Sequence, residues 1–330
     1  MEQKPATLDP LTSDWTRTFW DCCNSEDALK TNGHHVQSLK LYFDSNDHQY
    51  YDYDQSSDFF DFSPTSFPRL TSVTFYGMRN RGDLVIDIIR MGSEVGWKEL
   101  VFTMFDDRDQ SRSVVDGDNM VKAILRQAPT LEVLNLDGGS YFKSKDINKL
   151  LCSAPNLREL HLLGDTRSEF GEDPCLDAND VVQSEWVCTN LEIFGCSIGG
   201  IPRQDITRRI SDDSVSYFAC QGLHRDGINL QRGVYSQLSQ LTKLKQLYLG
   251  SPLKEYEEET ESDDIFPRQD HPFRQFDCLA MSLDSGLDQL KNLKNLHTVE
   301  LKDMEVYIDG PLEQKWIAEN WPKVKQVVLT

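Results

Sequence analysis

The stretch Ala128-Pro-Thr-Leu-Glu-Val-Leu-Asn-Leu136 decides the fold, because close copies of it recur along the chain. Ala154-Pro-Asn-Leu-Arg-Glu-Leu-His-Leu162 repeats it almost position by position, and Leu244-Lys-Gln-Leu-Tyr-Leu249 repeats its second part. The shared block is L-x-x-L-x-L, and its end alternates apolar residues with others. Such alternation is typical of a strand that is buried on one face only.

Six looser copies of the block accompany these three, and they begin at Val36, Leu70, Trp97, Leu191, Leu296 and Val324. The nine starts are separated by 34, 27, 34, 26, 34, 53, 52 and 28 residues. Each of the two long separations has room for one degenerate repeat or one insertion. The segment from Val215 to Leu223 is a candidate for a degenerate strand.

Segments with apolar residues at helical spacing lie between the blocks, at residues 119–126, 144–151, 234–241 and 287–293. Ser144 is a capping residue type at the start of one of them, and Pro311 suits the first turn of a last helix. A strand and helix that recur mostly every 26 to 34 residues cannot bury their apolar faces alone. The sequence therefore predicts an α/β leucine-rich-repeat solenoid with parallel inner strands and outer helices. The alternative is an ordinary α/β sheet that happens to be rich in leucine.

Two domains follow from this pattern: an N-terminal helical cap over residues 1–32 and a solenoid over residues 33–330. Trp15, Phe19 and Trp20 lie at helical spacing in the first segment. Because an open solenoid end exposes core residues, a short amphipathic helix is expected to cover the first repeat.

The solenoid is expected to carry insertions near residues 44–68 and 251–276. The first mixes acids with aromatic residues, which suits either a loop for a partner or an insertion whose rings pack on the solenoid edge. The second begins with residues 254–264, where seven of eleven residues are acids, so an exposed loop is expected there.

The chain is strongly acidic, with 54 Asp and Glu against 34 Lys and Arg and a net charge of −20. Such a charge disfavours nucleic acids and anionic membranes as partners and favours proteins. No stretch approaches 18 consecutive apolar residues, and no apolar run follows Met1, so neither a membrane span nor a signal peptide is expected. The eight cysteines form no Cys-x-x-Cys pair, which suits a reducing compartment, cytoplasmic or nuclear.

Motifs of catalysis and of metal binding are missing from the sequence. It contains no phosphate loop, no dinucleotide-binding glycine pattern and no Gly-x-Ser-x-Gly motif. The doublet His34-His35 is a poor metal pair, because adjacent side chains on an extended chain point apart. We therefore expect no enzyme, no cofactor and no metal. Arg203, Arg208 and Arg209 form a basic cluster that either neutralises neighbouring acids or contacts an acidic partner.

The residues on either side of the fourth block position are expected to point away from the core, onto the inner surface. This inner face comprises Ser38, Lys40, Ser72, Thr74, Glu99, Val101, Val133, Asn135, Glu159, His161, Ile193, Gly195, Gln246, Tyr248, Thr298 and Glu300. Partner contacts are predicted at Lys40, Thr74, Glu99, Asn135, Glu159, His161, Gln246, Tyr248 and Glu300. Tyr248 and His161 are the preferred anchors, because amphipathic rings give contact area at little entropic cost.

Particular stretches resemble the ribonuclease-inhibitor-like repeats of fungal F-box/leucine-rich-repeat proteins. They are residues 128–134 and 154–160, Trp186-Val-Cys-Thr-Asn-Leu191 with Gly200-Ile-Pro-Arg203, and the ending Trp316-Ile-Ala-Glu-Asn-Trp-Pro322. The resemblance extends from about Gly33 to the end. It implies the substrate-recruiting half of a ubiquitin-ligase adaptor, in which an N-terminal F-box docks the ligase core. Residues 1–32 show no Leu-Pro-x-Glu opening and are too few for an F-box, so the F-box is expected to be absent and the link to the ligase core stays open.

Function is therefore predicted as protein binding, with substrate recognition for a ubiquitin ligase as its particular form. One alternative is a GTPase-activating leucine-rich-repeat solenoid, for which Arg203 is the candidate residue that acts at a nucleotide bound by the partner. The other is a scaffold with no ligase link.

Overall fold

We describe a computed structural model of the chain over residues 14–18, 36–42, 67–76, 82–92, 96–103, 117–136, 142–163, 175–202, 225–250, 278–301, 304 and 310–328. In these residues one parallel sheet contains the strands β1 Asp14–Thr18, β2 Ser38–Tyr42, β3 Ser72–Tyr76, β4 Glu99–Thr103, β5 Val133–Leu136, β6 Glu159–His161, β8 Ile193–Gly195, β10 Gln246–Tyr248, β11 Thr298–Glu300 and β12 Gln326–Val328. They lie side by side in this order, so the sheet follows the chain from one end to the other. A smaller sheet pairs β7 Cys175–Asp177 with β9 Ser197–Gly199.

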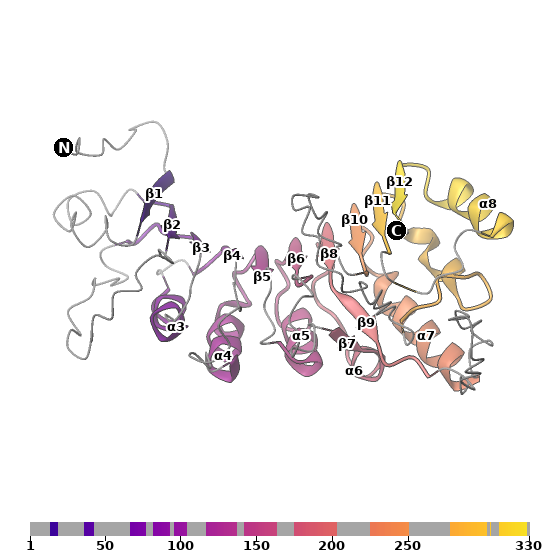
Figure 1. Cartoon of the computed structure of the whole chain (residues 1–330), viewed down its shortest axis with the longest axis horizontal. Helices are drawn as coiled ribbons and strands as arrows, with labels where there is room; N and C mark the ends of the chain where they lie inside the picture. The colour runs from indigo at the N-terminus through magenta and orange to yellow at the C-terminus, as the bar shows by residue number, and fades with distance from the viewer. Residues whose placement is uncertain are drawn as a thin grey trace, which may run out of the picture.

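Helices follow most of the strands: α3 Gly82–Met91, α4 Gly117–Gln127, α5 Ser144–Leu151, α6 Ala178–Val182, α7 Arg225–Leu238, the 3-10 helix η2 Leu287–Asn292 and α8 Pro311–Asn320. Figure 1 shows the strands along the inner side of an arc and the helices along its outer side. This arrangement arises because helices are wider than strands, so a stack of strand–helix units bends toward its strands. The described chain is a curved solenoid whose inner wall is the large sheet.

The core is built from the apolar positions of the repeated block. Leu134 of β5 is paired in register with Leu100 on one side and Leu160 on the other, and all three side chains are fully buried. The same row continues through Leu39, Val73, Phe194, Leu247 and Val299, all of which are also buried. All nine blocks supply strands of one sheet, in chain order. This confirms the predicted α/β leucine-rich-repeat solenoid with parallel inner strands and outer helices.

The structure differs from the expectation at the N-terminus. Residues Asp14–Thr18 lie inside the segment for which a helical cap was predicted, yet they form β1 and pair over five residues with β2. A short helix without a packing partner is marginal in water, whereas the free edge of β2 offers a complete row of backbone partners. The helical prediction was therefore wrong for these five residues. The rest of residues 1–32 lies outside the described part of the chain.

The long separations between blocks add no strand to the sheet. β8 pairs directly with β10, and β10 pairs directly with β11, so nothing is intercalated between them. Of the alternatives, an insertion therefore fits and an extra repeat within the sheet does not. The candidate strand from Val215 to Leu223 lies outside the described residues, as do 44–66 and 251–276 of the predicted insertions.

The start of α8 agrees with the sequence prediction, and the start of α5 differs from it. Pro311 occupies the first turn of α8, as predicted. Ser144 is the first helical residue of α5, and it does not cap the helix. Its hydroxyl donates instead to Asp180 Oδ2 at 2.6 Å, which links α5 to α6 of the next repeat. A tertiary hydrogen bond has taken the place of a local one.

Among the described residues, no helix is long and apolar enough to cross a membrane. Over the same residues, no group of His, Cys, Asp and Glu is arranged to hold a metal ion.

Candidate partner-binding face of the sheet

The predicted inner-face residues fall into two parallel rows on the large sheet. Strand register places Ser38, Ser72, Glu99, Val133, Glu159, Ile193, Gln246, Thr298 and Gln326 in what we call the first row. It places Lys40, Thr74, Val101, Asn135, His161, Gly195, Tyr248, Glu300 and Val328 in the second row. Gln326 and Val328 of β12 were not among the predicted residues and extend the two rows by one strand. The buried row of core residues runs between them. Positions as far apart in the sequence as Ser38 and Gln326 are thus brought onto one surface.

Exposure is uneven along the two rows. Most of the predicted contact residues are partly exposed, namely Lys40, Asn135, Glu159, His161, Gln246, Tyr248 and Glu300, and Glu99 is exposed. Thr74 is only 8% exposed, so it offers a partner little surface. Gly195 is buried as well, and it has no side chain to offer. Thr74 and Gly195 therefore interrupt the accessible part of the predicted site. That these residues contact a partner stays a prediction.

Polar groups of the face are linked both between strands and within one strand. Ser72 Oγ donates to Glu99 Oε2 at 2.7 Å, which joins β3 to β4 in the first row. His161 Nε2 lies 3.7 Å from Glu159 Oε2 on the same strand, so protonation of the imidazole would form an ion pair there. Acids outnumber lysines on the face, with Glu99, Glu159 and Glu300 against Lys40. The inner face is therefore weakly acidic, with apolar positions between its charges.

Tyr248 is held in one orientation by its own strand. The phenol donates to Gln246 Oε1 at 2.8 Å, and Gln246 is the first-row residue of the same strand. Burial, and after it the negative charge of Glu300, raise the pKa of Tyr248 above its usual value. The phenol therefore stays neutral at physiological pH and presents a fixed, amphipathic ring on the face.

A third row of side chains, one position before the first row, was not predicted. Backbone hydrogen bonds connect Thr71, Lys98, Glu132, Arg158, Glu192, Lys245, His297 and Lys325 in sequence, each amide donating to the carbonyl of the row residue before it, at 2.7 to 3.0 Å. We call these residues the edge row. Bases and acids alternate along it from Lys98 to Lys245. The signal was present in the sequence, because the second position of each block holds this residue, but it emerges only when the blocks are aligned.

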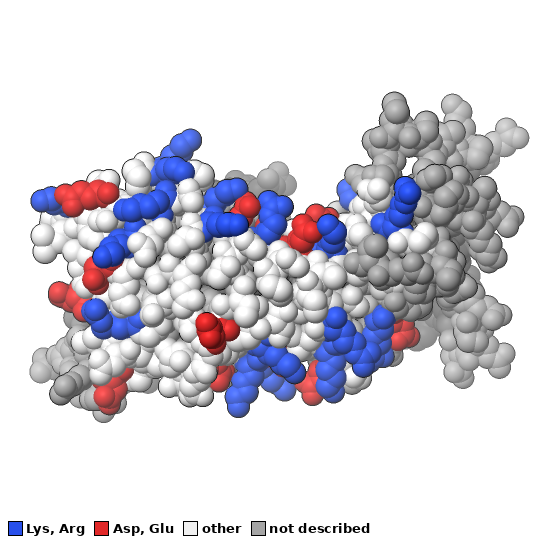
Figure 2. Space-filling model, turned by 180° about the vertical axis from the view of Figure 1, so that it is seen from behind, with Lys and Arg blue, Asp and Glu red and all other residues white. Residues whose placement is uncertain are grey.

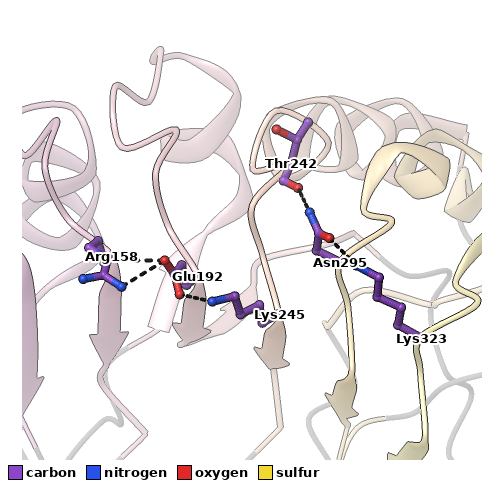
Figure 3. Close-up of polar contacts among 6 residues, drawn as sticks. All are labelled: Arg158, Glu192, Thr242, Lys245, Asn295 and Lys323. Carbon is purple, nitrogen blue, oxygen red and sulfur yellow. Dashed lines mark hydrogen bonds and ion pairs between the residues drawn. The ribbon is translucent and has the colours of Figure 1, made fainter.

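Ion pairs connect neighbouring repeats along the edge row. Lys98 Nζ lies 2.8 Å from Glu132 Oε1, and Arg158 Nη2 lies 3.0 Å from Glu192 Oε1. Glu192 also contacts Lys245 Nζ through its other carboxylate oxygen (Figure 3). The hydrogen bond from Lys245, supported by Arg158, holds the pKa of Glu192 below its usual range. Glu192 thus connects three repeats at the N-terminal ends of β6, β8 and β10.

Amide side chains form a second set of links in the turns that precede the strands. Asn156 Nδ2 donates to Pro129 O at 2.8 Å, and Asn295 Nδ2 donates to Thr242 O at 3.1 Å. Asn190 makes the equivalent bond to Pro155 O at 3.3 Å. In each case the asparagine stands just before the first leucine of its block. The position therefore fastens one turn to the turn of the preceding repeat.

The charge of the described residues differs from that of the chain. They contain 20 Lys and Arg against 18 Asp and Glu, whereas the whole sequence contains 34 against 54. The acidic excess therefore lies in the segments outside the described residues, and the solenoid itself is close to neutral. The net charge of the whole chain therefore does not describe the charge that a partner of the solenoid would meet.

No family model matches the chain, and no curated protein matches it. Among solved structures, it is similar to internalin C2 from Listeria monocytogenes, at 13% identity over 91% of this chain and 84% of that chain, with a TM-score of 0.37. It is also similar to a leucine-rich-repeat protein from Leptospira interrogans, at 13% identity over 89% of this chain and 90% of that chain, with a TM-score of 0.24. The fold class follows from the register of the nine blocks and not from these similarities.

Proposed function

We propose that this chain is a non-catalytic module that binds another protein through the inner face of its sheet. The observation that carries the proposal is the register of the nine blocks, which aligns two rows of side chains across the arc from β2 to β12. A wide, curved wall of this kind matches the dimensions of a protein surface.

The strongest contacts are expected on β6 and β10. Tyr248 presents a ring fixed by Gln246, and His161 presents an imidazole beside Glu159. Interfaces gain most of their free energy from a few such anchors, because rigid amphipathic rings bury area at a low entropic cost. Glu99, Glu159 and Glu300 would select a partner with basic residues around its apolar contact.

The more specific form of this function is substrate recognition for a ubiquitin ligase, in the cytoplasm or the nucleus. It is supported by the resemblance of residues 128–134, 154–160 and 186–203 to repeats of F-box/leucine-rich-repeat proteins. The ligase core is proposed as a further partner, which such proteins contact through the F-box. Nucleic acid, membrane, metal and cofactor have no place in the proposal.

Affinity purification of the full chain, followed by mass spectrometry, tests both levels. The native chain is expected to recover a true partner. The amount recovered should fall about tenfold or more with Tyr248→Ala or His161→Ala. It should be unchanged with Lys122→Ala and Lys149→Ala. The last two lysines are exposed on the outer helices α4 and α5 and serve as matched controls. Equal recovery with all four variants would refute binding through the inner face.

The same purification separates the particular forms of the function. Recovery of ligase-core subunits supports the adaptor, and their absence removes only the ubiquitin part. Recovery of small GTPases would favour the activating solenoid instead, although its candidate Arg203 lies outside the described residues. Stable self-association through the inner face, measured by light scattering, would favour a scaffold.

A further inference from the structure

A run of bases ends the edge row at the C-terminal repeats. From Lys98 to Lys245 each base of the row is next to an acid, but His297 and Lys325 follow Lys245 with no acid between them. The amide of His297 donates to Lys245 O at 2.7 Å, and the amide of Lys325 donates to His297 O at 3.0 Å. Since neighbouring strands are about 4.8 Å apart, these three basic residues are stacked within about 10 Å.

Three more lysines lie in the turns beside this run. Lys243 Nζ lies 2.6 Å from Asn190 Oδ1. Lys323 Nζ lies 2.7 Å from Asn295 Oδ1, and Figure 3 shows this second contact. Lys294 Nζ lies 2.9 Å from the carbonyl oxygen of Asn320. Neutral amide oxygens orient an ammonium group, but they do not cancel its charge. We call Lys243, Lys245, Lys294, Lys323 and Lys325 the lysine edge.

Among the described residues, little negative charge compensates the lysine edge. Within the described part of the chain, Lys245 is paired with Glu192, and no carboxylate is paired with Lys243, Lys294, Lys323 or Lys325. Figure 2 shows Lys and Arg side chains gathered over the end of the molecule that holds the last repeats, with few acids among them. Like charges at this spacing repel one another, so an acidic ligand would relieve the repulsion as well as form new pairs.

We propose that the lysine edge is a second binding surface, separate from the inner face, and that it takes an acidic polypeptide segment. Glu192 shows the mode of contact, because one carboxylate serves two bases of neighbouring repeats. An extended acidic segment presents a carboxylate on one face about every 6.6 Å, and flexible lysine stems can follow that spacing. A polypeptide is proposed rather than a nucleic acid because the anion that contacts bases of the edge row is a side-chain carboxylate, that of Glu192.

Binding of a fluorescently labelled oligo-glutamate peptide to the full chain, followed by anisotropy at low ionic strength, tests the surface. The triple variant Lys243→Glu, Lys323→Glu, Lys325→Glu is expected to raise the dissociation constant about tenfold or more. The control variant Lys122→Glu, Lys145→Glu, Lys149→Glu changes the net charge equally, on exposed residues of α4 and α5, and is expected to change the dissociation constant less than twofold. Added salt should weaken the binding of the native chain.

Further measurements keep the outcome decisive. A second triple variant changes Lys243, Lys323 and Lys325 to Gln. It should weaken peptide binding less than the triple variant to Glu does, and its circular dichroism should match that of the native chain. Tyr248→Ala should leave peptide binding intact, which separates this surface from the inner face. No detectable peptide binding, or an equal loss in the control triple, would overturn the proposal. So would tighter binding of a single-stranded oligonucleotide that the lysine-edge variants abolish, because it would assign the edge to nucleic acid.

Discussion

Arg158 Nη2 lies 3.0 Å from Glu192 Oε1, and this contact connects two repeats at the point where their strands begin. The same glutamate contacts Lys245 of the next repeat, which starts 53 residues later. Loss of the carboxylate would therefore remove two contacts and leave two bases facing each other. The alternation of charge along the edge row should therefore contribute to the free energy of unfolding.

We expect Glu192→Gln to lower the free energy of unfolding by about 1 kcal/mol. The effect is small because the side chain of Arg158 is half exposed, so that water screens the pair. Unfolding in urea, followed by circular dichroism, gives the value. Glu319→Gln is the control, because Glu319 lies 4.0 Å from Lys315 on the exposed side of α8 and should contribute nothing measurable. Equal midpoints for Glu192→Gln and the native chain would contradict the proposed linkage.

The acid dependence of stability should carry the signature of Glu192. The hydrogen bond from Lys245 and the pair with Arg158 hold the pKa of this carboxyl below its usual range. A pKa lowered in the folded state means that the stabilisation is complete above the unfolded-state pKa of about 4.3 and is lost as the pH falls through the folded value. The stability difference between the native chain and Glu192→Gln should thus be constant near neutrality and shrink below about pH 4. A difference that persists unchanged in acid would assign the effect to packing.

The repeated block determined what could be predicted about this fold. The spacing of Leu131, Leu134 and Leu136 indicates a strand that is buried on one face. The recurrence of the block implies that such strands stack side by side. From this follow the order of the nine block strands and the buried core row, and the structure agrees with both. That the inner-face residues contact a partner stays a prediction.

What the sequence could not predict depends on contacts between repeats. Asp14–Thr18 form a strand because β2 leaves a free edge, which local residue pattern does not reveal. Ser144 bonds to Asp180 from the next repeat, so its capping character is overridden by a tertiary partner. Thr74 occupies an inner-face position but is covered, since exposure depends on neighbours and not on alternation. The edge row was missed because each of its residues looks like an ordinary exposed charge until the blocks are set in register.

Gly227 should resist substitution although it lies in a helix. Alanine usually stabilises an exposed helical position relative to glycine by about 0.5–1 kcal/mol. In α7, however, a Cβ at this residue would lie 2.3 Å from Pro202 O, and the backbone cannot yield as a side-chain end can. We expect Gly227→Ala to destabilise the chain by about 1–3 kcal/mol. Thermal unfolding beside Ser236→Ala, at an exposed position of the same helix, provides the comparison. A stabilised Gly227→Ala would show that α7 does not approach Pro202 closely.

Cys188 should be inert toward alkylating reagents as long as the chain is folded. Its side chain lies just before the block of β8 and is fully buried, and this burial raises the pKa of the thiol to about 12. Because the thiolate is the reactive form, the reactive fraction at pH 8 is negligible, and solvent access is lost as well. Treatment with iodoacetamide followed by peptide mass spectrometry should label Cys152, which is partly exposed, well before Cys188. Addition of urea above the unfolding midpoint should bring the two rates together, since the unfolded chain has neither burial nor a raised pKa. Rapid labelling of Cys188 in the native chain would mean that this repeat opens far more often than a fully packed solenoid allows.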